Sequence, residues 1–286
     1  MTIAAGFRFA DGLLICADLE ITHGSELKTR ATKIFPYSFK ASGNKAVFTF
    51  SGDVALSRQC IQKIARKLAS ATKEKSLSAM QDIAAEQVYE FHQKYIFKHP
   101  HYQYGTGPTV DLIAALWSAE GQRLGLFQSS EHALIELSES EIMAVTGAGG
   151  SFASYAARPL IPHASMKLTD VITAVVYALK EAKDNVPGCG KGSELIAIMK
   201  SGEIGNKGWL HSSHVEAFAE SFEMGIKHLF VETCDLDTEE KQVKERFDAL
   251  WLVIQSTRSY LSNERKNHGP FARLVDTVLG KKVTEL

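Results

Sequence analysis

The chain has 286 residues, a formal net charge of −1 and 45% hydrophobic residues, enough for one large core and a smaller appended unit. The near-neutral charge and the lack of a long basic tract argue against a nucleic-acid surface. No apolar run approaches the roughly 20 residues of a membrane span, and the N-terminus lacks the positive segment of a signal peptide. Four widely spaced cysteines without a CxxC pair favour reduced thiols and a cytoplasmic location.

The N-terminal segment predicts a buried β-hairpin. Two apolar runs, residues 3–9 and 13–18, flank an Asp-Gly turn signal. Arg8 is the only charge in either run ahead of the final aspartate, so both strands should be largely buried. Removal of Met1 would leave Thr2, with a free amine, as the residue that enters this buried hairpin.

The next hundred residues predict a strand followed by two helices. Residues 19–32 are polar and are expected to form a connection across the surface, whereas residues 46–50 are rich in β-branched and aromatic side chains and predict a strand. Apolar residues then recur at helical spacing from Leu56 to Leu68, and a second amphipathic helix starts near Ser76. Two such helices in succession fit a layer packed on a sheet.

The remainder alternates strands and helices before becoming wholly helical. Short strands are predicted as an antiparallel meander over residues 110–117, 122–127, 133–137 and 141–146. Helices follow over residues 151–160 and 168–183, strands over 194–199 and on to about 209, and helices over 215–231 and from 237 onward, where an Asp-x-x-Glu pattern predicts a capping box. This order predicts an α+β fold, a four-layer αββα sandwich with a helical C-terminal extension.

Several N-terminal features occur in an order typical of one protein family. Thr2 stands at the mature N-terminus, Asp18 closes the second strand, Lys33-Ile34 starts a return to apolar character, and Gly52 lies before the first helix. In this order the chain resembles the proteasome β-type subunits, which are N-terminal-nucleophile hydrolases. The missing propeptide and the long helical C-terminus are similar to the bacterial ancestral-β-subunit (Anbu-like) group. The resemblance implies a hydrolase domain over residues 2–208 and an extension over residues 209–286.

The chemistry of these residues agrees with that resemblance. A threonine hydroxyl needs a base to accept its proton, and an α-amine with a pKa near 8 can serve. Lys33 would lower the pKa of the amine and hydroxyl, Asp18 would hold that lysine, and the backbone N–H of Gly52 is a candidate oxyanion donor. Taken singly, Asp18 could be a turn residue and Lys33 a surface lysine; the ordered set favours the site.

Two supporting positions depart from the family's pattern. Where the family has Gly-Ser-Gly, this chain has Ala148 between two glycines, with Ser151 a little further on. Asp184 matches the family's supporting aspartate, and either Cys189 or Ser193 stands where the serine after it belongs. The loss of a hydroxyl near the amine bears directly on whether the chain is active.

The resemblance also implies a substrate pocket beside the nucleophile. Its five residues carry no charge: Ile21, Ala31, Phe35, Phe50 and Val54. Because burying an unpaired charge there would be costly, we expect a preference for apolar residues before the scissile bond.

Other constellations predict no metal or cofactor. His92, His99 and His101 lie close in sequence, as do His211 and His214, but no acidic or cysteine partner lies at ligand spacing. The glycine-rich stretches at 147–150 and 188–192 lack the phosphate-loop pattern. Cys189, in the second stretch, has no neighbouring histidine to activate it and is interpreted as a structural thiol.

The sequence thus predicts a threonine-type peptidase or amidase that forms an acyl-enzyme with peptide or unfolded-protein substrates and uses no cofactor. A catalytically silent ring-forming scaffold, or binding module, of the same fold is the alternative, and a small-molecule amidohydrolase is a third interpretation. The resemblance implies a homo-oligomeric ring, with an ATPase unfoldase as a candidate partner and neither nucleic acid nor membrane as partners.

Overall fold

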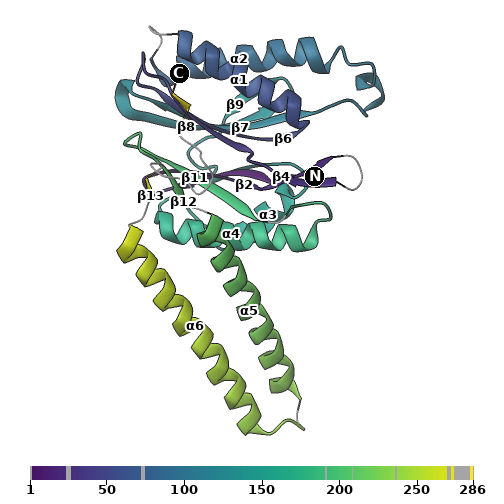
Figure 1. The fold of residues 1–286 in the computed structure, drawn as a ribbon, viewed down its shortest axis with the longest axis vertical. Coiled ribbons are helices and arrows are strands. Elements are labelled where there is room, and N and C mark those ends of the chain that lie inside the picture. Colours follow the sequence, from purple (N-terminus) through teal and green to yellow (C-terminus); the bar gives the residue numbers. More distant parts are fainter. Residues whose placement is uncertain are drawn as a thin grey trace.

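The computed structural model describes residues 2–23, 27–71, 75–190, 192–207, 209–235, 237–268, 272–273 and 284–285. Two helices cover one sheet, a second sheet packs beneath it, and two further helices cover the outer face of that second sheet (Figure 1). Two long helices then extend away from the sandwich as a projecting hairpin. This confirms the predicted αββα sandwich with a helical C-terminal region.

The sheet that carries the N-terminus has the order β10-β1-β2-β11-β12-β13. Its strands are β1 (Ala4–Phe9), β2 (Gly12–Asp18), β10 (Met143–Thr146), β11 (Ser193–Met199), β12 (Ile204–Lys207) and β13 (Ala272–Arg273). β1 and β2 form the predicted antiparallel hairpin, and every residue of β2 is buried. β2 lies between β1 and β11, and its last residue, Asp18, lies at the end of the strand next to the N-terminus.

The other sheet has the order β14-β5-β6-β7-β8-β9. Its strands are β5 (Ile34–Ser38), β6 (Lys45–Gly52), β7 (Val110–Ser118), β8 (Arg123–Ser130), β9 (Ala133–Glu136) and β14 (Thr284–Glu285). The predicted four-strand meander is correct for β7, β8 and β9 only. β10 crosses to the other sheet and pairs with β1, so segments from both sheets meet next to the N-terminus.

The segment after β2 differs from the predicted polar connection. It forms a two-stranded antiparallel hairpin of β3 (Glu20–His23) and β4 (Leu27–Arg30). Ile21 of β3 is buried although its neighbours are polar. A single buried side chain in a polar stretch gives no periodic signal, which explains why the sequence did not predict this hairpin.

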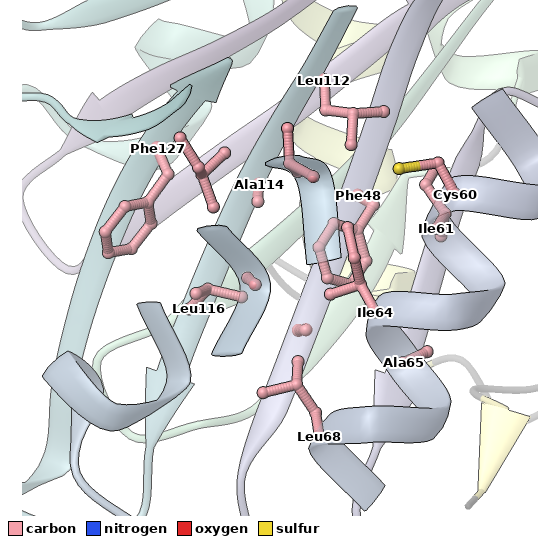
Figure 2. Close-up of a cluster of buried hydrophobic side chains, with 14 of the residues drawn as sticks. Phe48, Cys60, Ile61, Ile64, Ala65, Leu68, Leu112, Ala114, Leu116 and Phe127 are labelled. Atoms are coloured by element: carbon pink, nitrogen blue, oxygen red, sulfur yellow. The ribbon is translucent and has the colours of Figure 1, made fainter. Parts of the chain in front are cut away.

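The helices α1 (Val54–Ser70) and α2 (Leu77–Phe91) begin at side-chain caps. Asp53 accepts a hydrogen bond from the backbone N–H of Leu56 at 2.8 Å, and Ser76 caps α2 in the same way. In Figure 2, apolar side chains of α1 lie against the sheet in a cluster with Phe48 and Leu112. This packing fixes the start of α1, which follows directly from Gly52 at the end of β6.

The other helical layer consists of α3 (Gly150–Ala157) and α4 (Leu168–Asn185). Apolar residues of α4 at helical spacing pack against β1, β2 and β11. A third cluster of buried apolar residues lies between the two sheets: Leu13, Ile15, Ala17, Ile34, Val47, Ile113, Ala115, Trp117, Leu126, Leu137, Ala144, Ile196, Ile198 and Ile204. The site described below opens at one end of this central layer.

The projecting hairpin consists of α5 (Trp209–Cys234) and α6 (Glu240–His268). α5 begins at the residue where the sequence predicted the end of a strand, and α6 begins three residues after the predicted capping aspartate. The base of α5 is held by Glu216, which bonds to Lys183 of α4 at 2.5 Å and to the hydroxyl of Ser193 at 2.8 Å. Within the described residues, no helix combines the length and apolar character that crossing a membrane requires.

Candidate active site

Asp18 is the centre of the polar cluster at the N-terminus. Its carboxylate is fully buried and accepts hydrogen bonds from the backbone N–H of Ile3 at 2.8 Å and of Gly190 at 3.1 Å. The backbone N–H of Asp18 in turn donates to the carbonyl oxygen of Ile3 at 3.1 Å. These bonds tie the end of β2 to the residue that follows Thr2 and to the loop before β11.

Lys33 joins Asp18 to Thr2. Its ammonium nitrogen lies 2.7 Å from a carboxylate oxygen of Asp18 and 3.1 Å from the hydroxyl oxygen of Thr2. The Lys33 and Asp18 side chains are both 0% exposed. Desolvation lowers the pKa of Lys33, although the neighbouring Asp18 carboxylate acts in the opposite direction. Lys33 therefore connects the three predicted side chains.

Glycines allow the backbone to approach this cluster closely. Gly147 has a φ of 87°, and a Cβ there would lie 2.2 Å from the carbonyl oxygen of Thr2. Gly52 has a φ of 93°, and a Cβ there would lie 2.2 Å from the carbonyl oxygen of Thr109. A residue with a side chain would be strained at either position and would clash with the backbone.

A cavity of about 520 Å³ opens beside Thr2. Its lining consists of Thr2, Ile21, Ser51, Gly52, Val54, Thr109, Asp111, Gly147 and Ala148. Gly52 thus borders the same space as the Thr2 hydroxyl, as the predicted role of an oxyanion donor requires. The cavity has an apolar side at Ile21 and Val54 and a polar side at Ser51, Thr109 and Asp111.

Not every predicted pocket residue reaches the cavity. Phe50 is fully buried in the core beneath α1, where it stacks on Phe35 with ring centroids 6.1 Å apart. Phe35 and Ala31 are half-buried but do not line the cavity. The apolar side of the cavity is therefore formed by two of the five predicted residues, Ile21 and Val54.

The supporting residues are distributed differently from the prediction. Asp184, at the end of α4, is 58% exposed and pairs with Lys180 at 2.9 Å, so the structure does not bring it to the Thr2 cluster. Cys189 is buried. Its Sγ lies close to Gly149, because a Cβ on that glycine would be 2.7 Å from the sulfur and 2.5 Å from Ile3. Cys189 also acts electrostatically on Lys33, opposing the lowering of the Lys33 pKa. Its place in the fold is thus nearer to the cluster than that of Asp184.

The remaining candidates for supporting hydroxyls lie elsewhere. Ser193 is buried and binds Lys183 and Glu216, which connects it to α5. Ser151 is exposed in the first turn of α3. Ala148, which lines the cavity, offers no hydroxyl.

The polar side of the cavity was not predicted from the sequence. Ser51 contacts Thr146 through hydroxyl oxygens 2.9 Å apart and donates to Asp111 at 3.3 Å. These residues come from β6, β10 and β7, which the sequence places far apart. The one feature of the sequence that could have indicated this polar side is the aspartate at position 111, ahead of the apolar run of β7.

The histidines do not form a metal site in the described part of the chain, where no group of three or more potential ligand side chains occurs. His92 is buried, with its ring nitrogens 2.9 Å and 3.2 Å from backbone carbonyl oxygens. His99 is half-buried and His101 is exposed, and His214 contacts the hydroxyl of Tyr260. The side chain of His211 lies outside the described residues.

Known proteins resemble this chain in family and in fold. The family model for the proteasome subunit matches residues 2–198. Among solved structures, a mutant of Anbu from Hyphomicrobium sp. strain MC1 is 15% identical with a TM-score of 0.64, and the alignment covers 79% of this chain and 97% of that one. Anbu (ancestral beta-subunit) from Yersinia bercovieri is 12% identical with a TM-score of 0.64, covering 80% and 97%.

A third structure, of a helical assembly of the Anbu complex from Pseudomonas aeruginosa, is 13% identical with a TM-score of 0.67, covering 82% of this chain and 97% of that one. Among curated proteins, none matches the chain. At these identities the structural similarity shows a shared fold, and the match to the family model shows family membership.

Proposed function

The chain belongs to the proteasome subunit family, and on that premise we propose that it is a threonine-type peptidase or amidase. The observation that carries the proposal is the position of Lys33. Its ammonium group contacts both the Thr2 hydroxyl and the Asp18 carboxylate at the wall of a cavity that can admit a substrate.

The reaction starts when Met1 is removed and Thr2 acquires a free α-amine. The amine accepts the proton of the Thr2 hydroxyl as the hydroxyl oxygen bonds to the substrate's carbonyl carbon. Lys33 stabilises the developing negative charge on that oxygen, and Asp18 keeps the lysine charged and oriented. The backbone N–H of Gly52 donates to the carbonyl oxygen as it becomes an oxyanion.

The acyl-enzyme then forms and breaks down in two balanced steps. The α-ammonium of Thr2 gives its proton to the leaving amine as the C–N bond breaks, which leaves an ester on the Thr2 oxygen. A water molecule attacks this ester with the α-amine again as base, and the ester bond breaks to regenerate the hydroxyl and release the acid. No cofactor enters this scheme.

Two variants test the proposal. Thr2→Ala removes the nucleophile but keeps the amine, and it should abolish cleavage of casein and of fluorogenic peptides. Thr2→Ser keeps a hydroxyl and should retain part of the turnover. Each variant is first compared with the wild type by gel filtration, because a change in assembly would obscure the result. Unchanged turnover in a correctly assembled Thr2→Ala protein contradicts the mechanism.

A second candidate function, a catalytically silent ring-forming scaffold, is favoured by two observations. Ala148 lines the cavity without offering a hydroxyl, and Asp184 lies away from the Thr2 cluster. Retention of Met1 would favour this scaffold, because a blocked amine cannot act as the base. The mass of the intact purified protein separates the two functions.

The proposal extends to partners and location. Peptides or unfolded proteins are the proposed substrates, and turnover of amide metabolites without peptide cleavage would favour an amidohydrolase instead. We propose a homo-oligomeric ring in the cytoplasm, with an ATPase unfoldase as a candidate partner. Sedimentation analysis of the purified chain tests the assembly.

A further inference from the structure

Asp111 is a carboxylate in an otherwise apolar layer. On β7 its neighbours Val110 and Leu112 point into the core beneath α1 and α2, whereas Ile113, two positions on, is buried between the two sheets. Because side chains alternate along a strand, Asp111 shares the face of Ile113 and lies between the sheets at their open end. There it lines the cavity beside Thr2.

The hydrogen bonds to Asp111 leave much of its charge without compensation. One carboxylate oxygen accepts a bond from the Ser51 hydroxyl at 3.3 Å, and Ser51 also contacts Thr146. Within the described residues, no other hydrogen bond to this carboxylate and no ion pair with a lysine, arginine or histidine occurs. A partly desolvated carboxylate in this state is unfavourable until a cation approaches it.

The cations closest to the site are engaged elsewhere. Lys33 is bound to Asp18 and Thr2. Arg58 of α1 donates to the carbonyl oxygen of Thr32 at 3.3 Å and lies over the Phe35 ring. Both ring nitrogens of His92 lie against backbone carbonyl oxygens. None of them supplies the missing partner of Asp111.

We propose that Asp111 binds a cationic group of the substrate, an ammonium or guanidinium, next to the apolar residue that occupies the Ile21–Val54 side of the cavity. The two walls of the cavity differ in chemistry, so a substrate with an apolar side chain and a neighbouring positive charge complements both. This inference rests on the proposed function for the identity of the substrate, since it assigns the cavity to a peptide or amide held beside Thr2.

Asp111 adds selectivity rather than chemistry in this account. Gly147 lies against both Thr2 and Ser51: a Cβ there would lie 2.2 Å from the Thr2 carbonyl oxygen and 3.1 Å from Ser51 Cβ. The Asp111 carboxylate is bound by Ser51, whereas the Thr2 hydroxyl is bound by Lys33. A charge contact in a partly buried cleft discriminates strongly between cationic and neutral ligands.

Matched peptides test this selectivity. Each peptide has leucine before the scissile bond and carries either lysine or norleucine, which lacks only the ammonium group, at one of the neighbouring positions. We expect the wild type to favour lysine at one position by about ten-fold or more in kcat/KM. Asp111→Asn should bring that ratio close to one while cleavage of the norleucine peptide changes little.

Asp53→Asn is the matched control. Asp53 is an exposed carboxylate near the cavity, and asparagine caps a helix as well as aspartate does. The variant removes the same charge without touching the cavity, so it should keep the lysine preference. If Asp53→Asn and Asp111→Asn lower the ratio equally, the effect is one of overall charge and the inference is wrong.

Binding separates this inference from the proposed function. In the Thr2→Ala background, which should not cleave, calorimetry compares the Kd of the lysine and norleucine peptides with and without Asp111→Asn. A preference for lysine of about ten-fold that disappears with Asp111→Asn supports the inference even if the wild type proves inactive. Equal binding of the two peptides overturns it. An equal fall in kcat for both peptides in the active protein also overturns it, because Asp111 would then serve Thr2.

Discussion

The ammonium nitrogen of Lys33 lies 3.1 Å from the hydroxyl oxygen of Thr2, although 31 positions separate the two residues in the sequence. The contact depends on Asp18, which binds both the lysine and the backbone next to Thr2. A buried ammonium group held against a hydroxyl favours the deprotonated form of that hydroxyl. The catalytic proposal depends on this relationship.

Lys33→Met tests the contribution of that ammonium group. The change keeps the volume but removes the charge, so turnover should fall by about 10³-fold or more, as for other groups that act as a unit. The fully buried Asp18 would also lose its cation, which should lower the free energy of unfolding by about 3–5 kcal/mol. Peptide cleavage and urea denaturation measure the two effects.

Lys63→Met serves as the control for Lys33→Met. Lys63 lies on α1 over the Tyr95 ring, away from the cavity. This variant should cleave peptides at the wild-type rate. Wild-type turnover by a correctly assembled Lys33→Met protein would remove the lysine from the mechanism.

Gly190→Ala tests the support of Asp18 by the loop before β11. A Cβ at this position would lie 1.8 Å from the Cβ of Glu20, so the loop or β3 must shift, and we expect the shift to weaken the hydrogen bond from the Gly190 N–H to Asp18. We expect destabilisation by about 1–3 kcal/mol together with reduced turnover. Gly150→Ala, whose new Cβ would meet nothing closer than 3.4 Å, should be neutral or stabilising by about 0.5–1 kcal/mol.

Urea midpoints of the two glycine variants, each measured beside the wild type, provide the comparison. Equal stability of Gly190→Ala and the wild type would show that this loop does not hold Asp18.

The stability of the protein should depend on pH through Asp111. Desolvation raises the pKa of this carboxyl above its ordinary value of 3.8. Between 3.8 and the raised pKa, the folded state holds more protons than the unfolded state, so stability from this group falls as the pH rises through that window. Asp111→Asn lacks the group. The free energy of unfolding of the wild type minus that of the variant should therefore decrease from about pH 4 upward.

Urea unfolding of both proteins across this pH range measures that difference, in which the other titrating groups cancel. If the free energy of unfolding of the wild type minus that of the variant increases with pH, the folded state stabilises the Asp111 charge instead.

The apolar side of the cavity should set a preference before the scissile bond. Ile21 and Val54 offer no partner for a charge, so cleavage after leucine should exceed cleavage after arginine or aspartate. Val54→Ala removes two methyl groups from this wall and should reduce the leucine preference by about 1 kcal/mol, roughly five-fold. A fluorogenic peptide panel measures both, with the exposed Val231→Ala as control. Faster cleavage after arginine or aspartate would contradict this assignment of the apolar wall.

Local sequence patterns were sufficient for much of the fold and for part of the site. The alternation of apolar runs around an Asp-Gly turn predicted β1 and β2, and the helical spacing of apolar residues predicted α1 and α4. The same hairpin indicated that Thr2 would enter the buried part of the fold, whereas the role of Asp18 came from the family resemblance. Lys33 required the family resemblance, because a lysine after a polar stretch has no local signal for burial.

Contacts between distant segments could not be predicted in this way. The crossing of β10 to the other sheet brings Gly147 and Ala148 to the cavity, and β7 supplies Asp111. Phe50 is apolar, as expected of a pocket residue, but the alternation of side chains along β6 places it in the core. Asp184 was assigned to the site because it matches the family's supporting aspartate, whereas its side chain pairs with Lys180 on the same helix. The division at residues 2–208 and 209–286 stays a prediction.

Labelling with a peptide epoxyketone tests the central claim most directly, because this electrophile bonds to both the hydroxyl and the α-amine of an N-terminal threonine. We predict that the purified wild type lacks Met1, gains the mass of one label per chain, and carries that label on Thr2, whereas Thr2→Ala gains none. Retention of Met1, or a label on another residue such as Cys189, would contradict the account.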